Sequence, residues 1–332
     1  MTPRERFSAA LLRKPLTGRV PHFELVFYLT MEAMGKVHPA HRDYRQWDQM
    51  TANERQAQRR DVAQLLVDIA RRFEHGAINI RHRIPGGVDE TLRIVELIRE
   101  ISDDEFFVML GGDTTYGIPP GKMITKWCAW LHENLPAAKR EAAAKVDKSL
   151  AMADKVRRHG GVDGFTLCCD YCFSTGPFLS PSMFSEVVTP YLARLISGYR
   201  ELGFLTIKHT EGNILPILDQ LLQANPHALH SLDPKGGIDI AHVKRIIGHK
   251  ICLIGNVDCG MLAGGTDQQL VESASYALQH GMPGGGYIFS TSDCIYTGAE
   301  LARYEMMLEV WRRQGNYAVP AAGYSPAQQN AR

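Results

Sequence analysis

Short apolar runs alternate with amphipathic segments along nearly the whole chain. In residues 54–73, for example, Val62, Leu65 and Ile69 recur at helical spacing. Eight short apolar runs predict strands at 20–28, 77–80, 105–110, 164–169, 204–211, 228–232, 251–254 and 286–289. Strands that alternate with helices in this way are typical of a parallel sheet built from βα units.

The helices expected between these strands complete a regular pattern. They lie at 54–73, 89–101, 136–159, 181–202, 214–223, 240–247, 267–279 and 298–312. Eight βα repeats of the α/β class favour a closed (β/α)8 TIM barrel. The alternative is an open doubly wound sheet, but no G-x-G-x-x-G motif follows the first strand.

Both ends of the chain are expected to lie outside the repeats. Thr2 and Pro3 are suitable first residues for a helix over residues 4–13, which would form an N-terminal helical extension. The tail at 318–332 is rich in Ala, Pro and Gln, and we expect it to be disordered. Residues 1–317 are therefore predicted to form one domain. The long irregular segment 114–136 is expected to form a lid over an active site.

Composition narrows the classes of function. The chain has 332 residues, 45% of them hydrophobic, and a net charge of +1 without a Lys/Arg run, which argues against a nucleic-acid partner. No apolar run is long enough to span a bilayer, and the first residues predict a helix rather than a signal peptide. Seven cysteines, an odd number, then indicate free thiols in a reducing compartment, so we expect a cytoplasmic protein.

The sequence FLTIKHTEG at residues 204–212 is the most informative stretch for chemistry. A buried strand here would end in His209 and Glu211, which strand alternation places on the same face. An imidazole nitrogen and a carboxylate would then be directed at one point, as in a metal site. The alternative is a strand-end loop in which Glu211 is solvated and His209 is a capping residue.

Other polar residues also follow predicted strands, where the active sites of TIM barrels lie. They are Glu24 in the first strand and Asp113, Asp170, His209, Glu211, Asp233, Asn256, Asp258 and Cys294 at strand ends. His209, Glu211 and Cys294 form a plausible zinc set that leaves a fourth position open, as catalytic zinc requires. Asp113, Asp233 and Asp258 are equally well explained as helix caps.

Several short motifs, in order along residues 3–313, resemble the uroporphyrinogen decarboxylase superfamily, whose fold is a TIM barrel. They are Arg19-Val20-Pro21, the segment 170–181, Thr189-Pro190-Tyr191, KHTEGN at 208–213, LDP at 232–234, GNVD at 255–258 and STSDC at 290–294. The decarboxylases carry an Arg-rich motif after the first strand, where this chain has Phe27-Tyr28-Leu29-Thr30-Met31-Glu32. The chain is therefore more similar to the other branch, the zinc- and cobalamin-dependent methyltransferases.

This resemblance implies a metal site and a reaction. His209 and Cys294 match the family's zinc ligands, whereas Glu211 stands where a second Cys is expected. A harder oxygen donor suits zinc that acts as a Lewis acid on a substrate oxygen. We therefore expect O-demethylation, in which a methyl group passes from a methoxylated, aromatic substrate to the Co(I) corrinoid of a partner protein. Candidate pocket residues are the aromatic side chains Phe23, Phe27, Tyr28, Tyr116 and Trp127.

The remaining strand-end residues receive roles from the same resemblance. Asp170, Glu24 and Asp258 are expected to serve catalysis, Glu24 being either a displaceable fourth zinc ligand or an ion-pair partner inside the barrel. Asn256 and Asp233 are expected to contact the cofactor. A corrinoid protein would need the open barrel mouth, so a homodimer would use a side or the opposite face.

Three other functions remain open from the sequence. The first is a zinc enzyme that methylates a thiol such as coenzyme M, which would have to tolerate Glu211 in place of Cys. The second is a metal-free decarboxylase, in which His209 and the Asp residues perform acid–base chemistry. The third is a barrel used only as a binding scaffold, which the concentration of ligand-type residues at one end disfavours.

Overall fold

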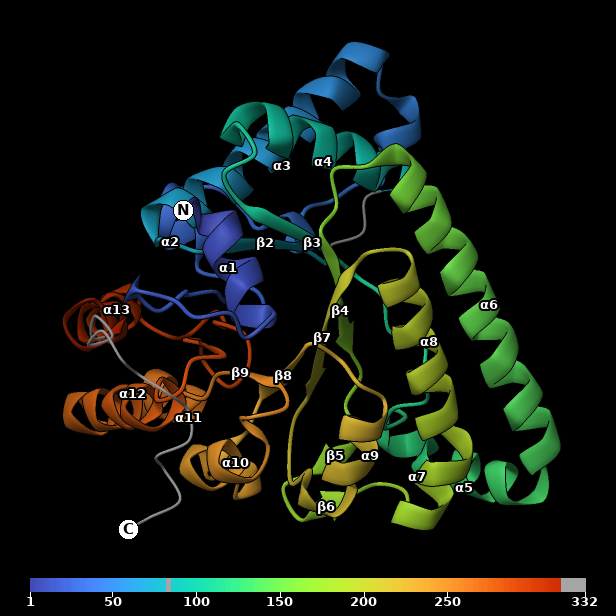
Figure 1. The fold of residues 1–332 in the computed structure, drawn as a ribbon. Helices are drawn as coiled ribbons and strands as arrows, with labels where there is room; N and C mark the ends of the chain where they lie inside the picture. Colours follow the sequence, from blue (N-terminus) through green and yellow to red (C-terminus); the bar gives the residue numbers. More distant parts are fainter. Residues whose placement is uncertain (82–84, 318–332) are drawn as a thin grey trace, which may run out of the picture.

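The computed structural model describes residues 1–81 and 85–317, so the tail expected to be disordered lies outside the described residues. Seven parallel strands form one curved sheet in the order β10-β9-β8-β7-β4-β3-β2 (Figure 1). Their bounds are β2 Ala77–Ile80, β3 Phe107–Gly111, β4 Gly164–Cys168, β7 Leu205–Thr210, β8 Ala228–Ser231, β9 Cys252–Ile254 and β10 Tyr287–Ile288. The shared strand direction gathers all their C-terminal ends at one edge of the sheet.

The segment at residues 20–28 takes the place of the eighth barrel strand. His22 bridges to Phe289 beyond β10, and its carbonyl accepts a 2.7 Å hydrogen bond from Gly76 beside β2, so the segment joins the two edges of the sheet. The predicted TIM barrel is therefore confirmed. The predicted regular strand at 20–28 is wrong, because Pro21 has no N–H and the Leu25 carbonyl accepts from the Asn79 side chain instead of a neighbouring backbone.

Helices surround the barrel, with α6 and α8 along one side and α12 and α13 on the opposite side (Figure 1). The α-helices are α1 Pro3–Leu11, α2 Thr30–Met34, α3 Ala52–Arg72, α4 Gly87–Ser102, α5 Ile124–Glu133, α6 Leu135–His159, α7 Pro181–Val187, α8 Thr189–Glu201, α9 Leu218–Gln223, α10 Ile240–Ile247, α11 Cys259–Gly264, α12 Asp267–Gly281 and α13 Leu301–Gln314. No described helix is both long and apolar enough to cross a lipid bilayer.

Short elements complete the chain. The two-residue strands are β1 Gly18–Arg19, paired with β11 Asn316–Tyr317, and β5 Cys172–Phe173, paired with β6 Gly176–Pro177. The 3-10 helices are η1 Pro39–His41, η2 Trp47–Gln49, η3 Gly121–Met123, η4 Leu215–Ile217 and η5 Pro234–Gly236. The single helix predicted at 181–202 is wrong: α7 and α8 are separate because Pro190, which has no N–H to donate, follows the break at Val188.

The N-terminal helix closes one end of the barrel. Phe7 on α1 packs its ring against Phe23 at 5.6 Å and Phe107 at 5.1 Å between centroids. These rings belong to the apolar cluster inside the barrel, which also contains Ile207 of β7. Apolar packing therefore fills the N-terminal half of the barrel and leaves polar side chains to the C-terminal half.

Alternation along β7 separates two neighbouring polar residues. Ile207 lies in the barrel interior, and His209 follows it on the same side, whereas Lys208 points outward. Lys208 is fully buried, and its Nζ lies 2.7 Å from Asp113 Oδ2 and 4.0 Å from the centre of the Tyr171 ring. Asp113, a strand-end carboxylate in the sequence, is thus the partner of a buried ammonium group.

We expect Asp113→Asn to lower the free energy of unfolding by about 3–5 kcal/mol, because it leaves the Lys208 ammonium buried without a carboxylate. Urea denaturation measures this. The control is Lys139→Ala, which removes the exposed Lys139–Glu186 pair and should cost less than about 1 kcal/mol. Equal stability of the two variants would contradict the importance of the buried pair.

Candidate active site

A cavity of about 320 Å³ opens at the C-terminal ends of the barrel strands. Four of the polar strand-end residues expected in the site line it: Asp170, His209, Glu211 and Cys294. The other lining residues are Val26, Tyr28, His38, Ala40, Asn79, Arg81, Cys168, Asp293 and Tyr296. Most of these side chains are polar, so the cavity is suited to chemistry on a polar or charged group.

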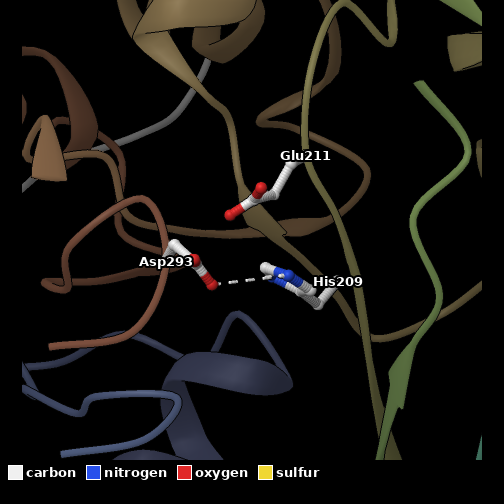
Figure 2. Close-up of side chains that lie close together, drawn as sticks. All are labelled: His209, Glu211 and Asp293. Atoms are coloured by element: carbon white, nitrogen blue, oxygen red, sulfur yellow. Dashed lines mark ion pairs between the residues drawn. The ribbon is translucent and has the colours of Figure 1, made fainter. Parts of the chain in front are cut away.

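Three side chains converge on one point of this cavity (Figure 2). His209 lies near the end of β7, Glu211 directly follows that strand, and Asp293 comes from the loop after β10. One ligand atom from each lies within 4.8 Å of the other two. His209 Nε2 is 3.9 Å from Asp293 Oδ1 and 3.8 Å from Asp170 Oδ1. We call His209, Glu211 and Asp293 the His–Glu–Asp cluster.

Carboxyl groups are concentrated in and around the His–Glu–Asp cluster. Burial and the neighbouring carboxylates of Asp293, Asp170 and Asp233 raise the pKa of Glu211 to about 9. Carboxylates held this closely resist ionising together, and a bound cation would relieve their repulsion. Imidazole nitrogen and carboxylate oxygen are both common zinc ligands. The donor set therefore fits a zinc ion.

A chain of buried polar groups extends from His209 into the barrel. His209 Nδ1 lies 2.7 Å from His230 Nδ1, and His230 Nε2 lies 3.3 Å from Ser290 Oγ. The Ser290 hydroxyl donates to Glu24 Oε2 at 3.3 Å, and the Thr291 N–H and hydroxyl donate to the same oxygen at 3.2 and 2.5 Å. Glu24 is therefore the final acceptor of a chain that begins at the His–Glu–Asp cluster.

The final acceptor determines which tautomers complete the chain. If Ser290 donates to Glu24, then His230 Nε2–H donates to Ser290, and His209 Nδ1–H donates to His230. His209 Nε2 then carries a lone pair directed at Glu211 and Asp293. Groups that fix the tautomer of a metal-binding His in this way strengthen metal binding. The chain thus prepares His209 to act as a ligand.

Glu24 lies deeper than its predicted catalytic role requires. The side chain is buried and does not line the cavity, and among the described residues its Oε1 has no hydrogen-bond partner. Burial raises the pKa of Glu24 to about 8, although hydrogen bonds from Thr291 and Ser290 oppose the shift. The structure therefore places Glu24 at the end of the polar chain rather than in the cavity lining, and its catalytic role stays a prediction.

The other strand-end residues lie around the cavity rather than in its lining. Asp258 caps α11 and accepts a backbone N–H at 2.6 Å. Asp233 caps η5 and also accepts the N–H of Gly212 at 3.2 Å, so it supports the turn after Glu211. Asn256 donates to the Leu232 carbonyl at 2.8 Å and lines a different cavity. The structure thus brings none of these three into the His–Glu–Asp cluster.

Cys294 follows Asp293 directly and shares the cavity without belonging to the cluster. Burial, followed by the charge of Asp293, raises the pKa of its thiol well above the usual value. The thiol is therefore protonated at neutral pH when no metal is bound. Its role as a zinc ligand stays a prediction.

One wall of the cavity is aromatic. The Tyr28 ring stacks on Tyr296 at 6.1 Å and on His41 at 5.0 Å, and the Tyr296 hydroxyl donates to Asp293. Of the aromatic residues expected to line the pocket, only Tyr28 does so. The described lining contains no residue of the expected lid at 114–136; instead, His38 and Ala40 come from the irregular segment before α3.

Asp293, His230 and Arg81 were not among the site residues predicted from the sequence. Asp293 stands beside Cys294 in a loop, and nothing in the sequence shows which of the two approaches His209 and Glu211. His230 is paired in register with His209 on the neighbouring strand, and its two-residue spacing from Ala228 in an apolar run was the available signal. Arg81 directly follows β2, as the other site residues follow their strands.

We expect the free energy of unfolding to depend on pH through Glu24. Between about pH 4.5 and about pH 8 the folded protein keeps the Glu24 proton, whereas the unfolded chain releases it. Stability should therefore fall as pH rises across this range, with a contribution of about 1.4 kcal/mol per pH unit. Glu24→Gln should remove this contribution, and exposed Glu133→Gln should not. If the free energy of unfolding of Glu24→Gln and of Glu133→Gln changed with pH in the same way, the expectation would be contradicted.

This chain is similar to known proteins in both sequence and structure. The model of the family "Uroporphyrinogen decarboxylase (URO-D)" matches residues 114–314. Among solved structures, a methyltransferase from Methanosarcina mazei superposes with a TM-score of 0.72 at 16% identity, covering 94% of this chain and 99% of that one. A search of curated proteins gives no match.

Two weaker structural similarities, from which nothing is inferred, are to GH5_18 from Streptomyces cattleya and a beta-mannanase from the blue mussel Mytilus edulis. The first has a TM-score of 0.48 at 13% identity, covering 90% of this chain and 81% of that one. The second has a TM-score of 0.47 at 7% identity, covering 90% and 93%. The family model spans more than half of the sequence, and the chain therefore belongs to the uroporphyrinogen decarboxylase family.

Proposed function

We propose that this protein is a zinc-dependent methyltransferase that moves a methyl group from a methoxylated, aromatic substrate to the corrinoid of a partner protein. The observation that carries the proposal is the His–Glu–Asp cluster at the mouth of the barrel. The structural similarity to the Methanosarcina mazei methyltransferase over nearly the full length of both chains supports the reaction class.

His209, Glu211 and Asp293 would hold the zinc ion and leave one position open for the substrate. When bound, the ion supplies Lewis-acid stabilisation of the charge that develops on the substrate oxygen. The oxygen-rich donor set suits an ether substrate better than a thiol, which is served by thiolate-rich zinc. Thiol methylation is therefore the less favoured alternative.

The surrounding side chains have separate tasks in this reaction. As the ether C–O bond breaks, its electron pair stays on oxygen, and the released product needs a proton. Solvent at the open barrel mouth can supply that proton, and Asp170, whose side chain is 52% exposed and lies 3.8 Å from His209, is placed to orient the substrate. The rings of Tyr28 and Tyr296 form an aromatic wall against which an aromatic substrate can pack.

The third ligand distinguishes this arrangement from the one expected from family resemblance, in which Cys294 binds zinc. Metal analysis of four purified proteins separates the two. We expect about one zinc per chain in the wild type and in Cys294→Ala, and loss of zinc in His209→Ala and Asp293→Asn.

Methyl transfer from a methoxyarene to Co(I) cobalamin should follow the zinc content of these four proteins. Zinc lost from Cys294→Ala but kept in Asp293→Asn would overturn the assignment of the third ligand. A wild type that binds no zinc would overturn the proposed mechanism, and would favour the acid–base decarboxylase.

His230→Phe tests the polar chain behind the metal site. Because it removes the acceptor for His209 Nδ1–H, we expect zinc affinity to fall about 10- to 100-fold, measured by competition with a chromophoric chelator. The matched control is His227→Phe, since His227 lies on the same segment and bonds to Thr206 away from the cavity. Similar zinc affinities for the two variants would count against the polar chain.

A further inference from the structure

We propose that Arg81 binds a carboxylate of the substrate, so that the substrates are methoxylated aromatic acids. This inference takes the methoxy group of the substrate from the proposed function. The carboxylate of the substrate is inferred from Arg81 and does not depend on that function. Its starting point is a cationic side chain in the wall of a cavity whose other charged lining groups, among the described residues, are carboxylates.

Arg81 lies where a substrate group would meet it. It directly follows β2 at the C-terminal edge of the sheet, and it lines both the catalytic cavity and an adjoining cavity of about 880 Å³. His209 and Cys294 line the same cavity, and they come from β7 and from the loop after β10, so residues from three parts of the barrel surround the space that Arg81 faces.

Within residues 1–81 and 85–317, no hydrogen bond or ion pair involves the Arg81 guanidinium. The largely buried Arg59 and Arg99 are instead paired with carboxylates: Arg59 Nε lies 2.6 Å from Glu90, and Arg99 NH2 lies 2.6 Å from Asp163. A guanidinium has five N–H donors in a planar fork that matches a carboxylate with two parallel hydrogen bonds. The Arg81 guanidinium therefore remains available to bind a ligand in the cavity.

The cavity then offers three kinds of contact. The His–Glu–Asp cluster is suited to a metal-bound ether oxygen, the Tyr28–Tyr296 wall to an aromatic ring, and Arg81 to an anion. A volume of about 320 Å³ is within the range of small-molecule sites. A ring that carries a methoxy group and a carboxylate has all three matching groups, whereas a neutral methoxyarene leaves Arg81 without a partner.

The test is calorimetric titration of the zinc-loaded protein with para-methoxybenzoate and with para-methoxybenzyl alcohol, which lacks the charge. We expect the acid to bind about 10- to 100-fold more tightly. Arg81→Gln should remove this preference and leave the alcohol unaffected. Arg81→Lys should restore part of it, because it keeps the charge without the fork. Exposed Arg140→Gln on α6 is the matched control and should bind both ligands as the wild type does.

Two results would overturn the assignment of Arg81. One is unchanged acid binding in Arg81→Gln together with its loss in His209→Ala, which would mean that the carboxylate binds the metal. The other is an equal loss of both ligands in Arg81→Gln. Since the titrations need no turnover, a preference for the acid that depends on Arg81 supports the assignment even if methyl transfer is absent, and only the proposed reaction would then fail.

Discussion

Repulsion among carboxylates that share a partly buried space is the constraint on which the site depends. Glu211 is held beside Asp293, Asp170 and Asp233, and its raised pKa reflects both burial and that crowding. Such an arrangement costs stability unless a cation is present. The barrel enforces it, because closure brings the loop after β10 against the end of β7.

Packing in the N-terminal half of the barrel and contacts on both faces of β7 hold the site residues in place. Phe7 on α1 fills the N-terminal end of the barrel, so the strands are packed firmly beneath the site. The buried Lys208–Asp113 pair anchors the outer face of β7 one residue before His209. On the inner face, His230 fixes the orientation of the His209 ring. Strand β7 thus carries a structural ion pair on its outer face, through Lys208, and the proposed metal ligand His209 on its inner face.

Much of the fold could be predicted from the sequence, because strand and helix periods are local properties. The strand at 77–80 and the helix at 240–247 have the predicted bounds. Local patterns failed where tertiary contacts decide. The segment at 20–28 has a strand-like composition, but the side chain of Asn79 takes over part of its pairing. The helix at 181–202 was predicted from its apolar spacing, although Pro190 divides it.

The site was only partly predictable for the same reason. The His209–Glu211 pair follows from two-residue alternation within one strand. Asp293, His230 and Arg81 belong to other strands, and their approach to His209 follows only from barrel closure and register. Arg81 also separates this chain from the Arg-rich pattern of the porphyrinogen decarboxylases, since its cation follows the second strand rather than the first. Among the described lining residues Arg81 is the one cation, which suits a single carboxylate better than a substrate that carries many.

The most direct measurement of the central claim is a crystal structure of the protein with anomalous difference maps recorded on both sides of the zinc absorption edge. The account predicts one zinc peak about 2.0–2.2 Å from His209 Nε2 and from a carboxylate oxygen of both Glu211 and Asp293. A zinc peak bonded to Cys294 and not to Asp293, or the absence of a peak at His209 in zinc-containing protein, would contradict it.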